Sequence, residues 1–188
     1  MKKILVIFCL LTSLNISAQQ IGGGLIGGLS ASQIDGDTQK DYKKLGVYSG
    51  VFVETDFTKV IGAKIELYYI IKGAKKMIND IEEFNTTLHY IEMPFLVTIK
   101  PVDKFQFDVG LGISYLIGSR LLNFGYEVYG GLYDMRDLDF GGMVSGSYFF
   151  TEKIGINVRI EYSLMSVKND KPNWYNSNLS FGLVYKIL

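Results

Sequence analysis

The sequence has 188 residues, with 19 basic and 19 acidic side chains, so its formal net charge is zero. A neutral chain lacks the basic excess that a phosphate backbone requires, which argues against nucleic acid as a partner. Hydrophobic residues make up 48% of the chain, which excludes intrinsic disorder. The abundance of Gly (21), Tyr (13) and Phe (12) over Pro (3) favours strands and tight turns in a single domain.

Residues 1–18 have the organisation of a signal peptide. Two lysines come first, an apolar run covers residues 4–14, and the small residues Ser17-Ala18 offer a cleavage site. The apolar run is shorter than the roughly 20 residues of a transmembrane helix. A lipoprotein signal is disfavoured because Cys9 lies inside the apolar run instead of at its end. The mature domain is therefore predicted to be residues 19–188, exported and free of cysteine.

The mature chain contains no segment of 18 consecutive apolar residues, so no transmembrane helix is predicted. Two classes remain for an exported, apolar chain rich in Gly and Tyr. One is a soluble β-protein of the periplasm or cell surface, and the other is a transmembrane β-barrel.

Apolar residues recur with a period of two along most of the chain. In residues 154–164, six apolar side chains alternate with Gly, Asn, Arg, Glu and Ser, which is the pattern of a strand with one apolar and one polar face. The same alternation is found in 61–72, 91–100, 105–118, 138–150 and 178–187, and more weakly in 21–32 and 45–55. These eight strands have about 9–12 residues each, the length of a tilted strand that crosses a bilayer.

The connections between the predicted strands alternate in length. Short connections are predicted at 56–59, 101–104 and 151–153, and longer ones at 33–44, 73–86, 119–137 and 165–177. Short turns on one side and long loops on the other are typical of an up-and-down barrel with an even number of strands. The prediction is an all-β, eight-stranded antiparallel transmembrane β-barrel, with both termini on the short-turn side, which is the periplasmic side of a Gram-negative outer membrane.

Three features indicate that the apolar face contacts outer-membrane lipid. Aromatic residues concentrate near strand ends, as in interfacial girdles, and the polar face is rich in the small residues Gly and Ser. The last strand also resembles the pattern that the barrel-assembly machinery reads during biogenesis, carried by Ser180, Gly182, Tyr185 and Ile187. A soluble lipocalin-like barrel, with the apolar face turned inward, is the alternative.

Charged residues on the polar face are balanced in sign. The predicted inward set is Glu54, Glu66, Glu92, Asp108, Asp139 and Glu161 with Lys64, Lys72, Lys100, Arg120, Arg159 and Lys186. Charges in a narrow lumen must be paired or hydrated, because unpaired burial costs several kcal/mol. We therefore expect an interior ion-pair network that fills the barrel, with a proton or ion path as the alternative.

Several short motifs resemble a known family. They are Lys72-Gly73-Ala74-Lys75, Tyr90-Ile91-Glu92-Met93-Pro94-Phe95-Leu96, Asp139-Phe140-Gly141-Gly142 and Ser180-Phe181-Gly182-Leu183. Together they resemble the outer-membrane β-barrel domain family abundant in Bacteroidetes, a group that the type IX secretion protein PorT also resembles. The resemblance covers the mature chain and implies a small outer-membrane barrel. It says little about the role.

Two motifs that could carry chemistry have simpler interpretations. Residues 22–27 match G-x-G-x-x-G, but they lack the preceding strand and following helix of a dinucleotide site, so small residues in a barrel wall are expected. His89 is the only histidine, which excludes a multi-histidine metal centre. No cofactor is predicted. His89 is expected at the membrane interface, with a lipid-hydrolysing site on the outer wall as the alternative.

Aromatic residues in the long connections are candidate contacts for a protein partner. They are Phe124, Tyr126, Tyr129 and Tyr133, which flank a predicted turn at Gly130-Gly131, and Trp174 and Tyr175 in the last loop. Membrane anchoring or packing between hairpins is an equal alternative. The sequence thus predicts a non-enzymatic outer-membrane barrel that serves as an accessory or scaffold subunit of an envelope complex, such as a secretion assembly. A lipid-modifying enzyme and a small-solute pore are the alternatives.

Overall fold

The computed structural model describes residues 21–36, 43–78, 81–128, 135–169 and 172–187. The predicted signal peptide lies outside the described residues. No helix in the described part of the chain has the length and apolar character needed to cross a membrane.

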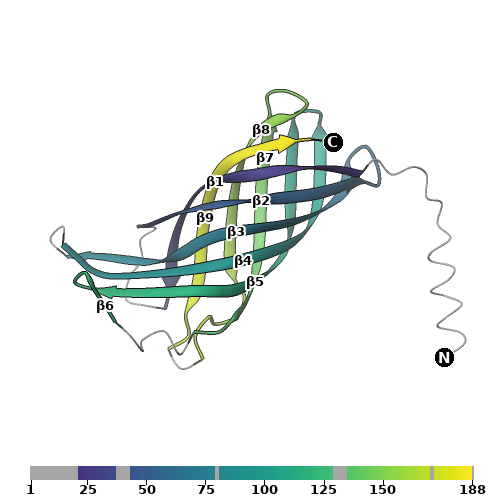
Figure 1. The fold of residues 1–188 in the computed structure, drawn as a ribbon. Coiled ribbons are helices and arrows are strands. Elements are labelled where there is room, and N and C mark those ends of the chain that lie inside the picture. Colours follow the sequence, from purple (N-terminus) through teal and green to yellow (C-terminus); the bar gives the residue numbers. More distant parts are fainter. Residues whose placement is uncertain (1–20, 37–42, 79–80, 129–134, 170–171, 188) are drawn as a thin grey trace, which may run out of the picture.

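The described residues form one antiparallel sheet that closes on itself (Figure 1). Its strands are β1 (Ile21–Asp35), β2 (Lys44–Asp56), β3 (Ile61–Ile78), β4 (Ile81–Val102), β5 (Phe105–Asn123), β6 (Tyr126–Glu127), β7 (Leu138–Phe149), β8 (Ile154–Ser163) and β9 (Tyr175–Lys186). Each long strand pairs with the next in the chain, and β9 returns to pair with β1. β6 is a two-residue strand paired with the end of β5. The predicted eight-stranded, up-and-down barrel is confirmed.

The two ends of the barrel differ as predicted. Short turns join β2 to β3, β4 to β5 and β7 to β8. Figure 1 shows that the start of β1 and the C-terminal end lie at this same end. The strands β1, β3, β5 and β8 end at the opposite end of the barrel, which we call the loop end.

One predicted loop is largely strand, and another begins as strand. The segment predicted as a loop at 73–86 continues β3 and β4 as a paired hairpin, and β5 continues to Asn123. Backbone pairing does not require an apolar face, so polar strands continue past the barrel rim, where alternation is no longer needed. In Figure 1, β3, β4 and β5 project beyond the other strands. We call this projection the paddle; it comprises residues 73–78, 81–89 and 118–123 together with β6.

Burial along the strands establishes which face points outward. On β8, Val158 and Ile160 are exposed while Arg159 and Glu161 are only 2% exposed. The same alternation holds on β9, where Leu179, Phe181 and Leu183 face outward. A soluble barrel would bury its apolar face, so the outward apolar wall contradicts the lipocalin-like alternative and fits a lipid environment.

Glycines allow the wall to close around large inward side chains. A Cβ on Gly24 would lie 2.8 Å from the Phe52 ring. Gly28 lies opposite Gly182 where β1 meets β9, and a Cβ on Gly28 would strike the backbone of β9. The Gly-rich motif at 22–27 is therefore part of a paired strand, as expected, and does not introduce a helix.

Candidate functional site: a charged lumen below a projecting sheet

The centre of the lumen holds a layer of four charges. Lys64 Nζ lies 2.5 Å from Asp108 Oδ2 and 3.1 Å from Glu66 Oε1. Arg159 Nη2 lies 2.7 Å from Glu66 Oε2, and its guanidinium is 5.2 Å from the centre of the Tyr68 ring. All of these side chains are buried. The layer is neutral and its members come from β3, β5 and β8, so it ties together opposite sides of the barrel.

A second layer lies toward the loop end and is centred on Lys72. Its ammonium is 2.6 Å from Glu92 Oε2 and 2.5 Å from Glu161 Oε1. Glu92 also accepts hydrogen bonds from the Tyr68 hydroxyl at 2.5 Å and from the Ser114 hydroxyl at 2.9 Å. These partners occupy both oxygens of Glu92.

Asp139 is held by neutral donors from two neighbouring strands. The Ser163 hydroxyl donates to its Oδ2 at 2.7 Å, and the Asn176 amide donates to the same oxygen at 3.0 Å.

A third layer lies at the short-turn end and is more open. Lys186 Nζ is 2.6 Å from Glu54 Oε1, and Lys100 Nζ is 2.7 Å from Asp56 Oδ1. The two lysine side chains are 19% and 20% exposed, so these pairs are partly hydrated. Phe149 is buried beneath Lys186, with 4.4 Å from Nζ to the ring centre. The position of Phe149 near a strand end predicts an aromatic residue of the membrane interface. In the structure its side chain instead points inward and narrows this end of the lumen.

Arg120 is the one predicted lumen charge that the structure places outside. Its side chain is 58% exposed and lies 3.6 Å from Glu127 of β6. A bulge in β5 causes the difference, because His89 pairs with Gly118 while Tyr90 pairs with Leu116. The extra residue, Ile117, reverses the alternation, so Leu121 is buried instead of Arg120.

Apolar side chains close the loop end of the lumen. Ile34, Ile70 and Leu88 are almost fully buried there, and Leu116 and Trp174 pack against the same cluster. Except for Arg120, the charges that the alternating pattern assigned to the inner face lie there. The pattern gave no indication of the apolar cap, because a single apolar residue on a polar face does not change the period.

Lys44 is a further buried lysine, and the alternating pattern of the sequence did not predict it. It begins β2, is 8% exposed, and donates to Asn85 at 2.8 Å and to Thr87 at 2.5 Å. The Ser32 hydroxyl donates to the carbonyls of Lys44 and Gly73 at 3.5 and 3.1 Å. These hydrogen bonds connect β1 and β2 to the base of the paddle. The alternation of apolar and polar residues in the sequence does not predict them.

The predicted loop contacts fall into three groups. Phe124 and Tyr126 are 59% and 80% exposed at the tip of the β5–β6 hairpin, where Phe124 and Gly125 both have positive φ. Trp174 is instead half-buried in the apolar cap beside Lys168, and Tyr175 stacks on Tyr162 with 6.1 Å between ring centres. The remaining predicted contacts, Tyr129 and Tyr133, and the predicted turn at Gly130-Gly131 lie outside the described residues.

His89 faces outward near the loop end, as its register predicted. Its Nδ1 lies 2.5 Å from the Tyr69 hydroxyl, and the two rings stack with centres 5.9 Å apart. The described residues contain no group of three or more His, Cys, Asp or Glu side chains suited to a metal ion.

The predicted assembly pattern lies on β9 and its last residues. Tyr185 and Ile187 are exposed on the outer wall, whereas Ser180 is buried and accepts a hydrogen bond from Asn178 at 2.8 Å. Gly182 faces the lumen, where an added Cβ would strike the Tyr48 hydroxyl. The pattern therefore coincides with the strand that closes the barrel.

Solved structures share this architecture at low sequence identity. The attachment invasion locus protein Ail of Yersinia pestis is 12% identical, with a TM-score of 0.55, over 88% of this chain and 98% of that one. Neisserial surface protein A (NspA) is 12% identical, with a TM-score of 0.56, over 88% of this chain and 97% of that one. At such identity the likeness concerns the fold alone. No curated protein sequence matches the chain.

A family model provides the assignment. The model described as "Outer membrane protein beta-barrel domain" matches residues 17–169. The match ends before β9, but β9 pairs with both β1 and β8, so the barrel continues to the end of the described chain. The outward apolar wall, the closed eight-stranded sheet and this match agree: the chain is an outer-membrane protein that belongs to the outer membrane protein β-barrel domain family.

Proposed function

We propose that this barrel is a non-enzymatic accessory or scaffold subunit of an envelope protein complex, a secretion assembly being one such complex. The observation that carries the proposal is the contrast between a filled lumen and a projecting sheet. Ion pairs and an apolar cap occupy the interior, whereas the paddle extends past the rim and ends in exposed aromatic side chains. A barrel with a filled lumen and a projecting sheet is better suited to holding a binding surface at the membrane than to transport.

The hairpin tip is the surface that we assign to the partner. Phe124 and Tyr126 expose large aromatic surfaces, and aromatic residues dominate the binding energy of protein interfaces. Tyr126 pairs with Asn123, and the Phe124 N–H donates to the Glu83 carbonyl, so both residues are held at the end of the sheet and little ordering is needed on binding. The orientation that we propose places both termini and the short turns in the periplasm and the paddle outside the cell.

Purification from native outer membranes in mild detergent tests the proposal. We expect a stoichiometric companion protein, identified by mass spectrometry, that is lost from a Phe124→Ser/Tyr126→Ser variant. Phe57→Ser is the matched control, because Phe57 is equally exposed (58%) but lies at the short-turn end. A barrel that is recovered alone contradicts the subunit proposal. Loss of the companion only from the Phe57 variant contradicts the assignment of the hairpin tip.

A further inference from the structure

The layer around Lys72 carries more negative than positive charge. Glu92 and Glu161 both contact the Lys72 ammonium, and Asp139 lies within electrostatic range of this layer. All four side chains are buried. Three carboxylates therefore accompany one ammonium, and the central layer of the lumen, which is neutral by itself, supplies no spare cation. Buried negative charge of this kind is costly unless a further positive partner is present.

The three carboxylates differ in how fully their oxygens are used. Both oxygens of Glu92 accept hydrogen bonds. The Glu161 carboxylate is held by Lys72 through Oε1 alone, and the Asp139 carboxylate is held through Oδ2 alone. The other two oxygens, Glu161 Oε2 and Asp139 Oδ1, are buried and have no hydrogen-bond partner among the described residues. The negative charge that lacks a partner therefore lies at Glu161 and Asp139.

Two asparagines of β9 bring further unpartnered oxygens to the same corner of the lumen. Asn178 lies directly opposite Glu161, and Asn176 donates to Asp139 Oδ2 at 3.0 Å. Because a carboxylate can only accept, Asn176 must present its Nδ2 to Asp139, which leaves its Oδ1 free. Both asparagines are at most 2% exposed, and the Oδ1 atom of each has no donor among the described residues.

Strand geometry places these four side chains side by side. β8 lies between β7 and β9 in the sheet, so Glu161 stands between Asp139 and the two asparagines. Glu161 leans toward β7, because a Cβ added to Gly141 would lie 2.9 Å from its Oε1. Gly141 and Asp139 occupy successive inward positions of β7. The corner thus gathers two carboxylate and two amide oxygens, all of them acceptors.

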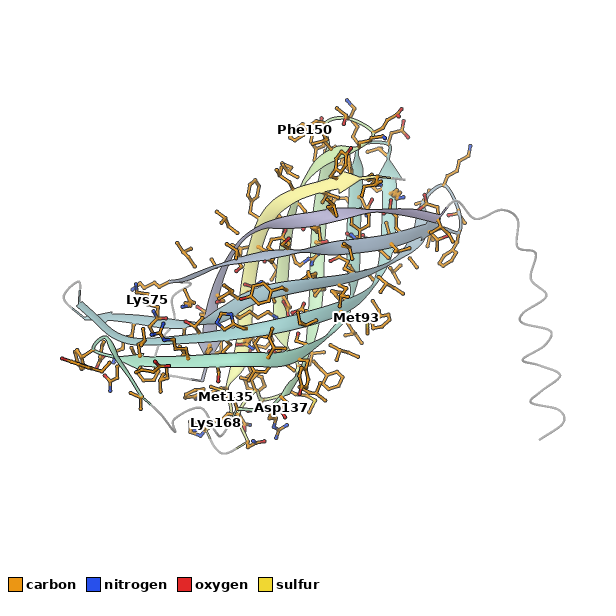
Figure 2. The ribbon with its side chains drawn as sticks, in the orientation of Figure 1. Lys75, Met93, Met135, Asp137, Phe150 and Lys168 are labelled. Atoms are coloured by element: carbon orange, nitrogen blue, oxygen red, sulfur yellow. The ribbon has the colours of Figure 1, made fainter. Side chains whose placement is uncertain are left out.

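This corner is closed to bulk water. Its four side chains are at most 2% exposed. Toward the loop end, a bridge between Met135 and Lys168 joins the segment before β7 to the segment after β8, and the Arg136 N–H donates to the Val167 carbonyl at 2.8 Å. Figure 2 shows Met135, Asp137 and Lys168 grouped at this end. A ligand of this corner must therefore be small and must leave most of its hydration shell behind.

We propose that this corner is a structural binding site for one calcium ion. The ligand atoms are Asp139 Oδ1, Glu161 Oε2, Asn176 Oδ1 and Asn178 Oδ1. Carboxylate and amide oxygens are the ligands that calcium prefers, and its double charge balances the three carboxylates and one ammonium of the layer. Magnesium suits a closed site less well, because it gives up its water shell reluctantly. Only two ligands are acidic, which is compatible with the lack of a group of three acidic or histidine side chains in the described residues.

The test refolds the full mature chain from denaturant into neutral detergent micelles with calcium, with magnesium or with the chelator EGTA. Each folded sample is then washed with EGTA, which removes calcium from exposed carboxylates but not from the closed site. Elemental mass spectrometry measures retained metal, and the temperature at which the folded band disappears on an electrophoresis gel measures stability. We expect one calcium ion per barrel, no retained magnesium and a higher temperature after folding with calcium. A folded barrel that retains no calcium would overturn the site.

Two variants that remove the same charge separate a ligand from a nearby charge. Glu161→Gln should retain no calcium, and its new amide N–H can donate to Asn178, so its stability should not depend on calcium. Glu92→Gln lies beside the same Lys72 but should keep the ion, because both oxygens of Glu92 have other partners. Equal retention by wild type and Glu161→Gln would overturn the assignment. Asp139→Asn provides the same test if Glu161→Gln does not fold.

Proton uptake is the competing explanation for the excess negative charge. It predicts that barrels folded in EGTA gain stability when the pH is lowered, that Glu161→Gln loses this gain and that the wild type retains no calcium. This combination of results would overturn the calcium site. The site does not depend on whether the hairpin tip binds a protein, so either outcome leaves that proposal to its own test.

Discussion

Arg159 on β8 and Glu66 on β3 meet across the lumen, with 2.7 Å between Nη2 and Oε2 and both side chains almost fully buried. Between these strands the sheet order places β2, β1 and β9. The pair therefore joins walls that share no backbone hydrogen bond. A closed barrel can resist flattening through such cross-lumen contacts, which makes this pair a structural brace.

Removal of both members of the brace should cost less stability than the two single removals added together. Arg159→Met leaves Glu66 buried with only Lys64 nearby and should lower the free energy of unfolding by about 3 kcal/mol. Arg159→Met/Glu66→Gln should lose less than the sum of the single variants, because no uncompensated charge remains. Urea unfolding in micelles, followed by tryptophan fluorescence, measures all four proteins. Strictly additive losses would show that the two residues are independent.

Closure of the barrel should depend on the Gly28–Gly182 seam. Gly28→Val places a branched side chain against the backbone of β9 and should abolish the compact, heat-modifiable band on electrophoresis. Gly146→Ala is the control, because its Cβ would only touch the Phe107 ring at 3.6 Å. The control should fold with wild-type stability. A folded Gly28→Val protein would mean that the seam can separate without loss of the barrel.

The alternating stretches of the sequence were sufficient to predict the membrane part of the fold. From Ile154 to Leu164 every second side chain faces outward, so the difference between the surroundings outside and inside the barrel sets the period. The paddle was not predicted because its strands, such as residues 73–78, carry no such period in their sequence. Arg120 was misplaced for a related reason: a one-residue bulge reverses a face, and nothing in the local composition marks Ile117 as the extra residue.

We expect Phe124 to contribute to partner binding although its backbone conformation slightly lowers the stability of the hairpin. Its φ of +46° lies in the left-handed region, which is unfavourable by about 1 kcal/mol for a residue with a side chain. Phe124→Gly should therefore stabilise the hairpin slightly, seen as slower hydrogen exchange at Val128, whose N–H donates to Leu121. The same variant should weaken capture of the companion protein. Stabilisation without weaker capture would remove Phe124 from the interface.

His89 should be dispensable for the chemistry of membrane lipids. In His89→Ala cells, mass spectrometry of extracted outer-membrane lipids should give the wild-type profile, because we assign His89 an interfacial packing role with Tyr69. Tyr69→Phe removes only the hydroxyl and should behave in the same way. A change in acylation or headgroup composition that appears in both variants would support a lipid-modifying enzyme and contradict the non-enzymatic proposal.

The occupied lumen predicts that the barrel conducts no ions. Lys72, whose ammonium is held between Glu92 and Glu161, and the apolar cap around Leu88 both occupy the lumen. Hydrophobic constrictions of this kind exclude water and ions. Purified protein in planar bilayers should therefore give no discrete current steps, and Leu88→Ala should remain silent because the ion-pair layers persist beneath the cap. Steps of uniform size in the wild type, abolished by heat unfolding, would instead establish a small-solute pore and place the ion pairs along its path.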